Sequence, residues 1–405
     1  MKEKSRKTNE ERGITLIALV ITIVILIILA TVSINVVFGE GGLIDRAQEG
    51  KSLTDQAQTD EQEELTGAEE YINGILVGIE NQNPPGEKSE VAEAIENGTK
   101  YTDTTPIKDD LENTVYIPGG FHLAKDSGTK VEEGIVIEDD VGNQFVWIPT
   151  GTYNVTTEVE KITEPDEQDG KLTNALSRRT FSSSGSTLVN GDDVISSYYY
   201  GEGNTKYTSV AKDQIAGFKT SATNNKGFYV GRYEAGTETE RKSNSDTLTT
   251  PLVQANKYPY VYVSRDQAKL KAETIYSGNE AIKATSELIS SYAWDTTLNF
   301  ICQTNKEGYL LATATEDTYG NIGTSNKTQT GEYEADDYSN IHDFLGNRHE
   351  WTTEYSSYSD SNYTYTCVNR GGSYYDNVTY SSTRFSHTTG FSSESNYSFR
   401  LQLYV

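Results

Sequence analysis

Cysteine and histidine, the residues that most often bind metals or act as nucleophiles, are scarce in this chain. The cysteines and histidines are Cys302, Cys367, His122, His342, His349 and His387. No two histidines have the spacing that places a metal-binding pair on one helix face, and no Gly-x-Ser-x-Gly elbow or phosphate-binding loop occurs. The sequence therefore predicts no catalytic residue. The two cysteines can be free, buried or paired, so a disulfide stays open.

The chain is strongly acidic and rich in tyrosine. Its 405 residues carry a formal charge of −26, a balance that repels phosphate backbones and argues against a nucleic-acid partner. Tyrosine occurs 28 times, a bias that favours a β-rich or irregular domain with a wet surface over a helical enzyme.

The stretch NRGGSYYDNVTYSSTRFSHTTGF, residues 369–391, consists almost wholly of Ser, Thr, Tyr, Asn, Gly and isolated charges. Tyrosine provides rigid contact area and Ser or Asn provide adaptable hydrogen bonds, which is the residue usage of binding loops. The alternative is that the stretch only solvates a surface. Candidates for ligand contact in and just after this stretch are Tyr374, Tyr375, Asp376, Asn377, Tyr380, His387 and Tyr397.

The N-terminal region contains one long apolar run. Residues 14–38 carry no charge, and a helix of that length would cross a bilayer core of about 30 Å. Five basic residues within residues 1–13 predict that this leader stays in the cytoplasm. The sequence thus predicts a single-pass cell-membrane protein that contacts the membrane through residues 14–38 and places its C-terminal domain at the cell surface.

A basic leader that ends in Gly13, followed by Ile14-Thr-Leu-Ile and the apolar run, resembles the prepilin-type (type IV pilin-like) processing signal. The resemblance implies cleavage between Gly13 and Ile14 by prepilin peptidase, and N-methylation of Ile14. It departs at Ala18, where pilins carry a Glu that registers subunits in the filament, so assembly into a pilus or pseudopilus is open. A plain single-pass anchor is the alternative.

The rest of the chain divides by composition. Apolar residues at helical spacing predict a helical stalk over 39–82, and the paired prolines of NQNPPGEKSE end it, which leaves a linker over 83–114. From residue 115, short segments such as FVWIP, GFYVGRYEAG and YVYVS predict strands. Helices are predicted over 264–273, with Ser264 as N-cap, and across 284–301, and the final FRLQLYV alternates like a closing strand.

Several segments together, FVWIP, GFYVGRYEAG, ELISSYAWDTTLNFI, NIHDFLGNRHEWT, VNRGGSYY and YSFRLQLY, resemble the formylglycine-generating enzyme (sulfatase-modifying factor) family. The resemblance covers residues 115–405, with an insertion-like region at 153–215. It implies a C-type lectin-like fold. The predicted fold class is therefore α+β, with an N-terminal transmembrane helix followed by a C-type lectin-like domain.

Enzymes of this family oxidise a substrate cysteine with two copper-binding cysteines that follow the Gly-Gly-Ser. Matching the segments residue by residue puts Asp376 and Ser381 at those two positions. The soft thiolates that copper(I) requires are absent there. The resemblance therefore implies a domain without copper and without catalysis, although a surviving oxidase stays the third hypothesis.

The resemblance also implies a structural calcium ion. In the family, the segment that matches 343–350 holds Ca²⁺, and here Asp343 and Glu350 supply carboxylates while the backbone carbonyls of Gly346 and Arg348 supply further oxygens. The alternative is that Asp343 caps a turn and Glu350 pairs with an arginine such as Arg370.

These features lead to a hypothesis about function. We expect a membrane-anchored binding protein whose C-terminal domain presents the Tyr/Ser/Asn-rich stretch to an unknown protein or glycan. The residue bias of the stretch is also similar to that of the variable proteins of diversity-generating retroelements. The alternative is a minor pilin or pseudopilin that acts as a structural subunit.

Overall fold

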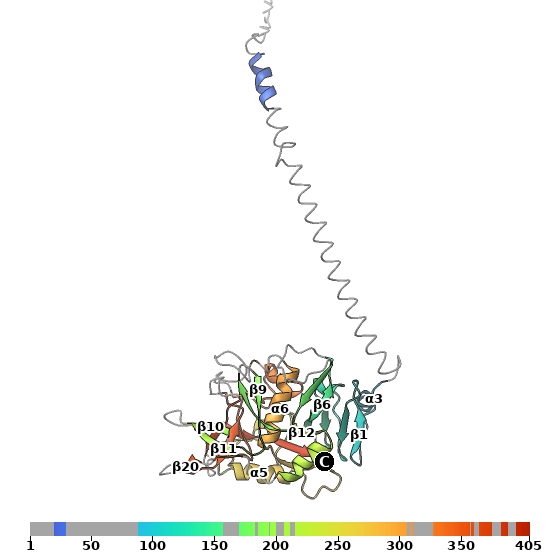
Figure 1. Ribbon diagram of the computed structural model, residues 1–405, viewed down its shortest axis with the longest axis vertical. Helices are drawn as coiled ribbons and strands as arrows, with labels where there is room; N and C mark the ends of the chain where they lie inside the picture. The colour runs from blue at the N-terminus through green and yellow to red at the C-terminus, as the bar shows by residue number, and fades with distance from the viewer. Residues whose placement is uncertain are drawn as a thin grey trace, which may run out of the picture. The chain divides into compact units, whose positions relative to one another are not determined.

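The structure is a computed structural model that describes residues 20–29, 88–156, 170–182, 185–193, 195–199, 206–210, 215–305, 308, 310, 327–356, 358–359, 364–374, 382–387 and 394–405. The chain divides into two units, Met1–Pro85 and Gly86–Val405, and each is considered by itself (Figure 1). The predicted leader over 1–13 and the predicted stalk over 39–82 lie outside the described residues.

The described part of the first unit is a helical segment at 20–29, drawn in blue in Figure 1. Among the described residues, none of the helices combines the length and the apolar character that a membrane span requires. This finding corrects two predictions, the N-terminal transmembrane helix and the single-pass membrane localisation.

The second unit is built on two larger sheets. The first has the strand order β15 (Thr285–Leu288), β25 (Leu401–Tyr404), β12 (Gly227–Gly231), β5 (Gln144–Pro149), β4 (Val136–Glu138) and β3 (His122–Leu123). The second has the order β19 (Tyr355–Ser356), β11 (Lys206–Val210), β10 (Ile195–Tyr199), β23 (Phe385–His387), β22 (Cys367–Arg370), β18 (His349–Trp351) and β24 (Tyr397–Phe399).

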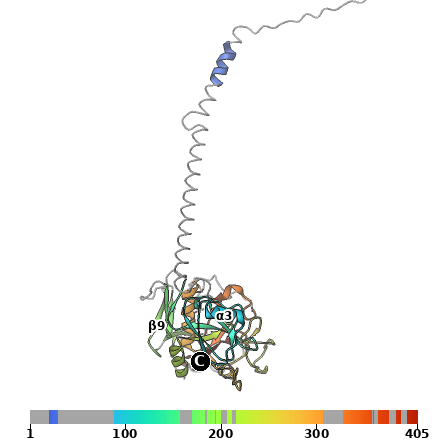
Figure 2. The ribbon, with the colours of Figure 1, turned by 90° about the vertical axis from the view of Figure 1, so that its right-hand side faces the viewer.

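Smaller hairpins and short helices complete the unit. The paired strands are β1 (Thr105–Lys108) with β2 (Thr114–Ile117), β6 (Gly151–Asn154) with β7 (Lys171–Asn174), β8 (Arg178–Ser182) with β9 (Gly185–Val189), β13 (Gly236–Thr237) with β14 (Tyr258–Pro259), β16 (Asp337–Tyr338) with β17 (Ile341–His342), and β20 (Tyr358–Ser359) with β21 (Thr364–Tyr365). The helices are α3 (Glu90–Asn97), α4 (Ala216–Asn224), α5 (Arg265–Thr274) and α6 (Ser291–Thr304), with 3-10 turns η1 (Val131–Glu133) and η2 (Glu334–Asp336). Because α3 lies at the right-hand edge of the unit in Figure 1, it faces the viewer in Figure 2.

The predicted fold class is corrected by this architecture. In place of a transmembrane helix followed by a C-type lectin-like domain, the described residues form a sheet-rich unit with several small sheets and short helices. The range predicted as a linker, 83–114, contains α3 and β1. The side chain of Asp109 there accepts bonds from the backbone of Leu111, Asn113 and Val131, which organises the segment.

Local sequence signals account for several elements. Helix α5 begins after Ser264, whose side chain accepts a hydrogen bond from the Gln267 N–H. The Ser264 N–H in turn donates to the Gln267 side chain, and the predicted N-cap is confirmed. The predicted helix over 284–301 is confirmed only in its second half, because residues 285–288 pair with β25 as a strand. The closing strand is confirmed as β25, which lies between β12 and β15.

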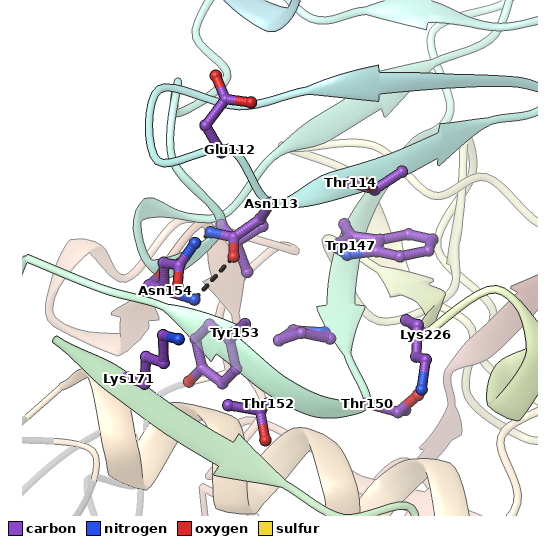
Figure 3. A pocket seen from close by; sticks show the side chains of 12 residues that line it. Glu112, Asn113, Thr114, Trp147, Thr150, Thr152, Tyr153, Asn154, Lys171 and Lys226 are labelled. Carbon is purple, nitrogen blue, oxygen red and sulfur yellow. Dashed lines mark hydrogen bonds between the residues drawn. The ribbon is translucent and has the colours of Figure 1, made fainter. Parts of the chain in front are cut away.

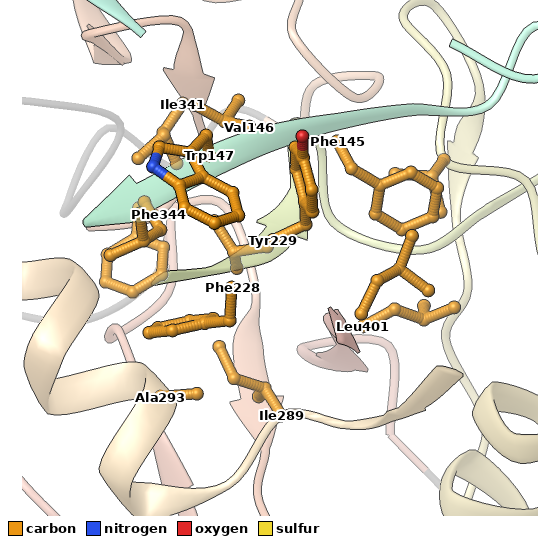
Figure 4. Close-up of a cluster of buried hydrophobic side chains, with 14 of the residues drawn as sticks. Phe145, Val146, Trp147, Phe228, Tyr229, Ile289, Ala293, Ile341, Phe344 and Leu401 are labelled. Atoms are coloured by element: carbon orange, nitrogen blue, oxygen red, sulfur yellow. The ribbon is translucent and has the colours of Figure 1, made fainter. Parts of the chain in front are cut away.

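The core occupies both faces of the first sheet, and α6 covers the face opposite to that of Trp147 (Figure 4). Trp147, Phe145, Tyr229 and Leu401 project from the sheet strands and are each at most 1% exposed. From the helix side, the ring of Trp294 stacks on Phe344 with centroids 4.7 Å apart. Burial of such large aromatic side chains provides the main favourable free energy of folding.

Gly227 shows how tightly this core is packed. A Cβ atom at this position would lie 2.1 Å from Cζ2 of Trp147. We expect Gly227→Ala to destabilise the unit by about 1–3 kcal/mol, because the indole must move within a close-packed core. Urea denaturation measures this effect, with Gly278→Ala as control. A Cβ atom at Gly278 would have no atom within 4 Å, so that substitution causes backbone strain (φ +78°) but no steric clash. A smaller cost at Gly227 than at Gly278 would contradict the prediction.

Candidate functional site

The polar stretch is anchored by buried arginines. Arg370 Nη1 lies 2.7 Å from Asp295 Oδ1, and Arg384 pairs with both Asp295 and Glu354. Arg178 pairs with Glu354 as well. All these side chains are at most 3% exposed. Arg370 and Arg384 both lie within the stretch, and both act as framework rather than as presented surface.

The buried ion pairs control the charge state of Glu354. Burial by itself would raise the pKa of this carboxyl, but the guanidinium groups of Arg384 and Arg178 outweigh burial and hold the pKa at about 2. Burial and the neighbouring Arg384 lower the pKa of Arg370 to about 10. Glu354 and Arg370 are therefore both charged at neutral pH.

Two of the predicted contact residues are buried. His387 and Tyr397 are 8% and 2% exposed, and both contact Trp351, whose ring stacks on Tyr397 with centroids 5.1 Å apart. These side chains pack in the second sheet, and their contact with a ligand stays a prediction. Four other candidates, Tyr375, Asp376, Asn377 and Tyr380, lie outside the described residues.

Tyr374 is the predicted contact residue that the structure places beside a cavity. Its backbone N–H donates to the Asn347 carbonyl (3.0 Å), and its half-buried ring lies 4.7 Å from the guanidinium carbon of Arg348 and 5.7 Å from Lys327 Nζ. Arg348 and Lys327 both line a half-open cleft of about 380 Å³. We call this cavity the Tyr374 cleft. Its other lining residues include Tyr258, Tyr262, Gln329 and Ser395.

Residues on both sides of the segment 375–393 meet at this cleft. Lys327 Nζ donates to Ser395 Oγ (3.2 Å) and contacts the ring of Tyr374. The Tyr262 N–H donates to the Glu394 carbonyl at 3.3 Å. Residues 374 and 394–395, which flank the segment 375–393, are thus held within reach of the same few side chains.

Backbone strain marks the same place. Tyr262 has φ +56° and Asn347 has φ +51°. The left-handed conformation is tolerated by Asn but is costly for a bulky residue such as Tyr, and strain of this kind concentrates at binding sites. Tyr262 is held by the bond from Arg241 Nη2 to its carbonyl (3.0 Å). The sequence segment YVYVS, predicted as a strand, therefore forms an irregular wall of the cleft.

The cleft carries more basic than acidic side chains. Arg241, Lys242, Lys327 and Arg348 line it together with Glu240 and Glu332. Arg241 is committed to backbone carbonyls and Lys242 lies 3.5 Å from Glu240. Arg348 is 4% exposed, donates from Nη1 to the Asn347 carbonyl, and has no partner for Nε among the described residues. Arg348 and Lys327 are therefore the cations best placed to meet a polar ligand.

Both carboxylates predicted to bind calcium accept hydrogen bonds from the protein. Asp343 Oδ2 accepts from the Gly331 N–H at 2.6 Å, and Glu350 accepts from Arg400 Nε (2.6 Å) and from Trp294 Nε1 (3.2 Å). Gly346 forms the turn with φ +145°. Burial raises the pKa of Asp343 to about 6 and also raises that of Glu350. No cluster of three or more potential metal ligands occurs among the described residues.

This geometry favours the alternative interpretation of the segment 343–350, in which Asp343 caps a turn and Glu350 pairs with an arginine. The ion-pair partner of Glu350 is Arg400. Arg370 lies opposite Glu350 in the β18–β22 strand pairing, but its guanidinium pairs with Asp295. A calcium ion stays a prediction from the resemblance.

The cysteines do not form a disulfide. Cys302 and Cys367 are both free and buried. Burial raises the pKa of Cys302 strongly and that of Cys367 to about 11. Because the thiolate is the reactive form, neither residue has the environment of a nucleophile or of a soft metal ligand.

Comparisons with known proteins add little. No family model and no curated protein matches the chain. One solved structure that matches, described as the crystal structure of CarF, shares 17% identity over 54% of this chain and 100% of its own, with a TM-score of 0.32. A likeness this low carries no argument about fold or function. The predicted processing residues, Gly13 and Ile14, lie outside the described residues.

Sequence reasoning missed most of the cleft. The sequence predicts a role for Arg348 only through its backbone carbonyl, as a calcium ligand. It predicts no ligand contact for Lys327, Tyr258 or Tyr262. No local pattern marks these residues, because they come from three separate segments that only the tertiary structure brings together. The signal that sequence does contain is the tyrosine bias around Tyr374.

Proposed function

We propose that the unit Gly86–Val405 is a non-catalytic ligand-binding domain and that the Tyr374 cleft is its binding site. The observation that carries this proposal is the position of Lys327, which contacts Tyr374 on one side of the segment 375–393 and Ser395 on the other. The described residues that flank this segment therefore lie at the cleft. Tyrosine rings, hydroxyl groups and a free guanidinium edge there suit a saccharide or a polar peptide segment.

The resemblance to the formylglycine-generating enzyme family supports the same proposal. The two positions of its copper-binding cysteines carry Asp376 and Ser381, and the remaining thiols are buried with raised pKa values. A domain without those thiolates can still bind a ligand through its loops. Diversification of the polar stretch by a retroelement is a further part of the proposal, and it rests on residue bias alone.

The test is a binding screen of the full-length chain against a glycan array and a peptide array. We expect Tyr374→Ala to lower affinity for any ligand found about tenfold or more, whereas Tyr374→Phe keeps the ring over Arg348 and loses less. Arg348→Lys keeps a charge but removes the planar donor, and is expected to weaken binding as well.

The matched control is Leu270→Ala on α5, a side chain that is 57% exposed and does not line the cleft. The array that gives the signal decides between a glycan and a peptide ligand. Equal binding by the wild type, Tyr374→Ala and Arg348→Lys would remove the cleft from the site and defeat the proposal.

A further inference from the structure

A second cleft lies at a different place in the unit, between the β1–β2 turn, β5, the β6–β7 hairpin and the turn before β12 (Figure 3). It has a volume of about 440 Å³ and is half open to solvent. We call it the Trp147 cleft. It shares no lining residue with the Tyr374 cleft.

The indole N–H of Trp147 is an unused donor in this cleft. Trp294 Nε1 donates to Glu350 and Trp351 Nε1 donates to the Val263 carbonyl (3.0 Å), so the other two tryptophans are satisfied. Trp147 is 1% exposed, lines the cleft and has no hydrogen-bond partner among the described residues. In Figure 3 its nitrogen lies on the side of the ring nearer Asn113 and Tyr153. The nitrogen is not among the buried polar atoms that lack a partner, so it is open to the cleft, where a ligand oxygen can accept from it.

Two lysines in the cleft are unpaired as well. Among the lysines whose side chains the structure describes, all but Lys125, Lys171 and Lys226 have a hydrogen bond, an ion pair or a ring contact. Lys171 and Lys226 both line the Trp147 cleft. The chain has 60 acidic and 34 basic residues, so most ammonium groups have a carboxylate available as a partner. Two unpaired lysines in one cavity are therefore unusual for this chain.

The backbone holds one of these lysines at a cost. Lys226 has φ +58°, and its carbonyl accepts the Thr150 N–H at 2.9 Å. Gly or Asn adopts this left-handed conformation more readily than Lys, so turn geometry does not explain the lysine. Its side chain is shown near Thr150 at the edge of the cleft in Figure 3.

From these donors we infer that the Trp147 cleft binds a small organic anion through a carboxylate or phosphate group. The oxyanion accepts from Lys171, Lys226 and the Trp147 indole, and the carbon frame contacts the apolar wall formed by Val131 and Pro149. A carbon frame is expected because the cavity is much larger than one inorganic ion. Glu112 also lines the cleft, and its carboxylate opposes an anion.

The experiment follows the indole N–H signals of the full-length chain labelled with ¹⁵N-tryptophan, during titration with succinate or inorganic phosphate at constant ionic strength. We expect the Trp147 signal, assigned with Trp147→Phe, to move saturably with a dissociation constant of about 1 mM or tighter for at least one probe. The signals of Trp294 and Trp351 serve as internal references because both indoles are bonded within the protein. Response to one probe alone identifies the oxyanion as carboxylate or phosphate.

Charge variants complete the test. Lys171→Met and Lys226→Met should each weaken binding about tenfold or more, and Glu112→Gln should strengthen it. Lys125→Met is the matched control, because Lys125 is also unpaired but does not line the cleft. The inference is overturned by the absence of a saturable Trp147 shift with both probes, or by a shift that survives both lysine variants unchanged. An equal loss in Lys125→Met also overturns it.

Discussion

Asp295→Asn is expected to destabilise the Gly86–Val405 unit by about 3–5 kcal/mol. Asp295 is fully buried and accepts from both Arg370 and Arg384. The amide has nearly the same shape as the carboxylate but no charge, so two guanidinium groups would be left in the interior with only Glu354 nearby. Removing one member of a buried charge network leaves an uncompensated charge, which is more costly than the loss of a surface pair.

Urea denaturation of the full-length chain, followed by tryptophan fluorescence, measures this effect. The matched control is Asp266→Asn, which removes a carboxylate that is 67% exposed and lies 3.1 Å from Arg265 Nε. Exposed pairs contribute about 1 kcal/mol or less. If the two variants lose similar amounts of stability, the network does not anchor the polar stretch and its framework role is wrong.

His342→Phe is expected to flatten the pH dependence of stability. Burial, together with Arg232 and Arg400, lowers the pKa of His342 from 6.5 to about 4. Between these two values the unfolded chain binds a proton that the folded chain does not bind, so the stability present above pH 6.5 is lost as the pH falls toward 4. For this one group the decrease in the free energy of unfolding is on the order of 3 kcal/mol. The variant has no imidazole to protonate, so it does not show this decrease.

The measurement is the free energy of unfolding of wild type and variant at several pH values across this window. Phe can retain the stacking of His342 on Tyr233, whose ring centroids are 4.9 Å apart. Asp343 acts in the opposite sense, because its pKa is raised to about 6 and its contribution is greatest at low pH, but it is present in both proteins. Parallel curves of unfolding free energy against pH for the two proteins would show that His342 does not cause the pH dependence. His342→Gln is a second variant that lacks the titrating imidazole.

Local signals in the sequence were sufficient for some elements. Ser264 followed by Gln267 is a capping box, and the helix that begins there depends on residues three positions apart. Alternation in FVWIP and in FRLQLYV likewise predicted strands that the structure contains as β5 and β25. Such patterns are readable because the interactions that form them lie within one turn or one strand.

Other segments required tertiary contacts that no local pattern contains. Thr285–Leu288 has the composition of the following helix but pairs with the C-terminal strand about 115 residues later. The segment 260–263 alternates like a strand, yet Tyr262 takes a left-handed conformation that Arg241 and Glu394 hold in place. The apolar run at 14–38 predicted a membrane span, whereas none of the helices among the described residues has the length and apolar character of one.

By itself, the sequence determined the strand-rich character of the C-terminal unit, the capped helix at Ser264 and the polar stretch that begins at Asn369. Only the tertiary structure decided which members of that stretch are framework and which reach a cavity. Arg370, Arg384, His387 and Tyr397 became interior residues because they meet buried partners from distant segments. Tyr374 remains beside a cleft because Asn347 and Arg348 hold it there. Burial depends on contacts between residues far apart in the chain, and residue type alone does not specify those contacts.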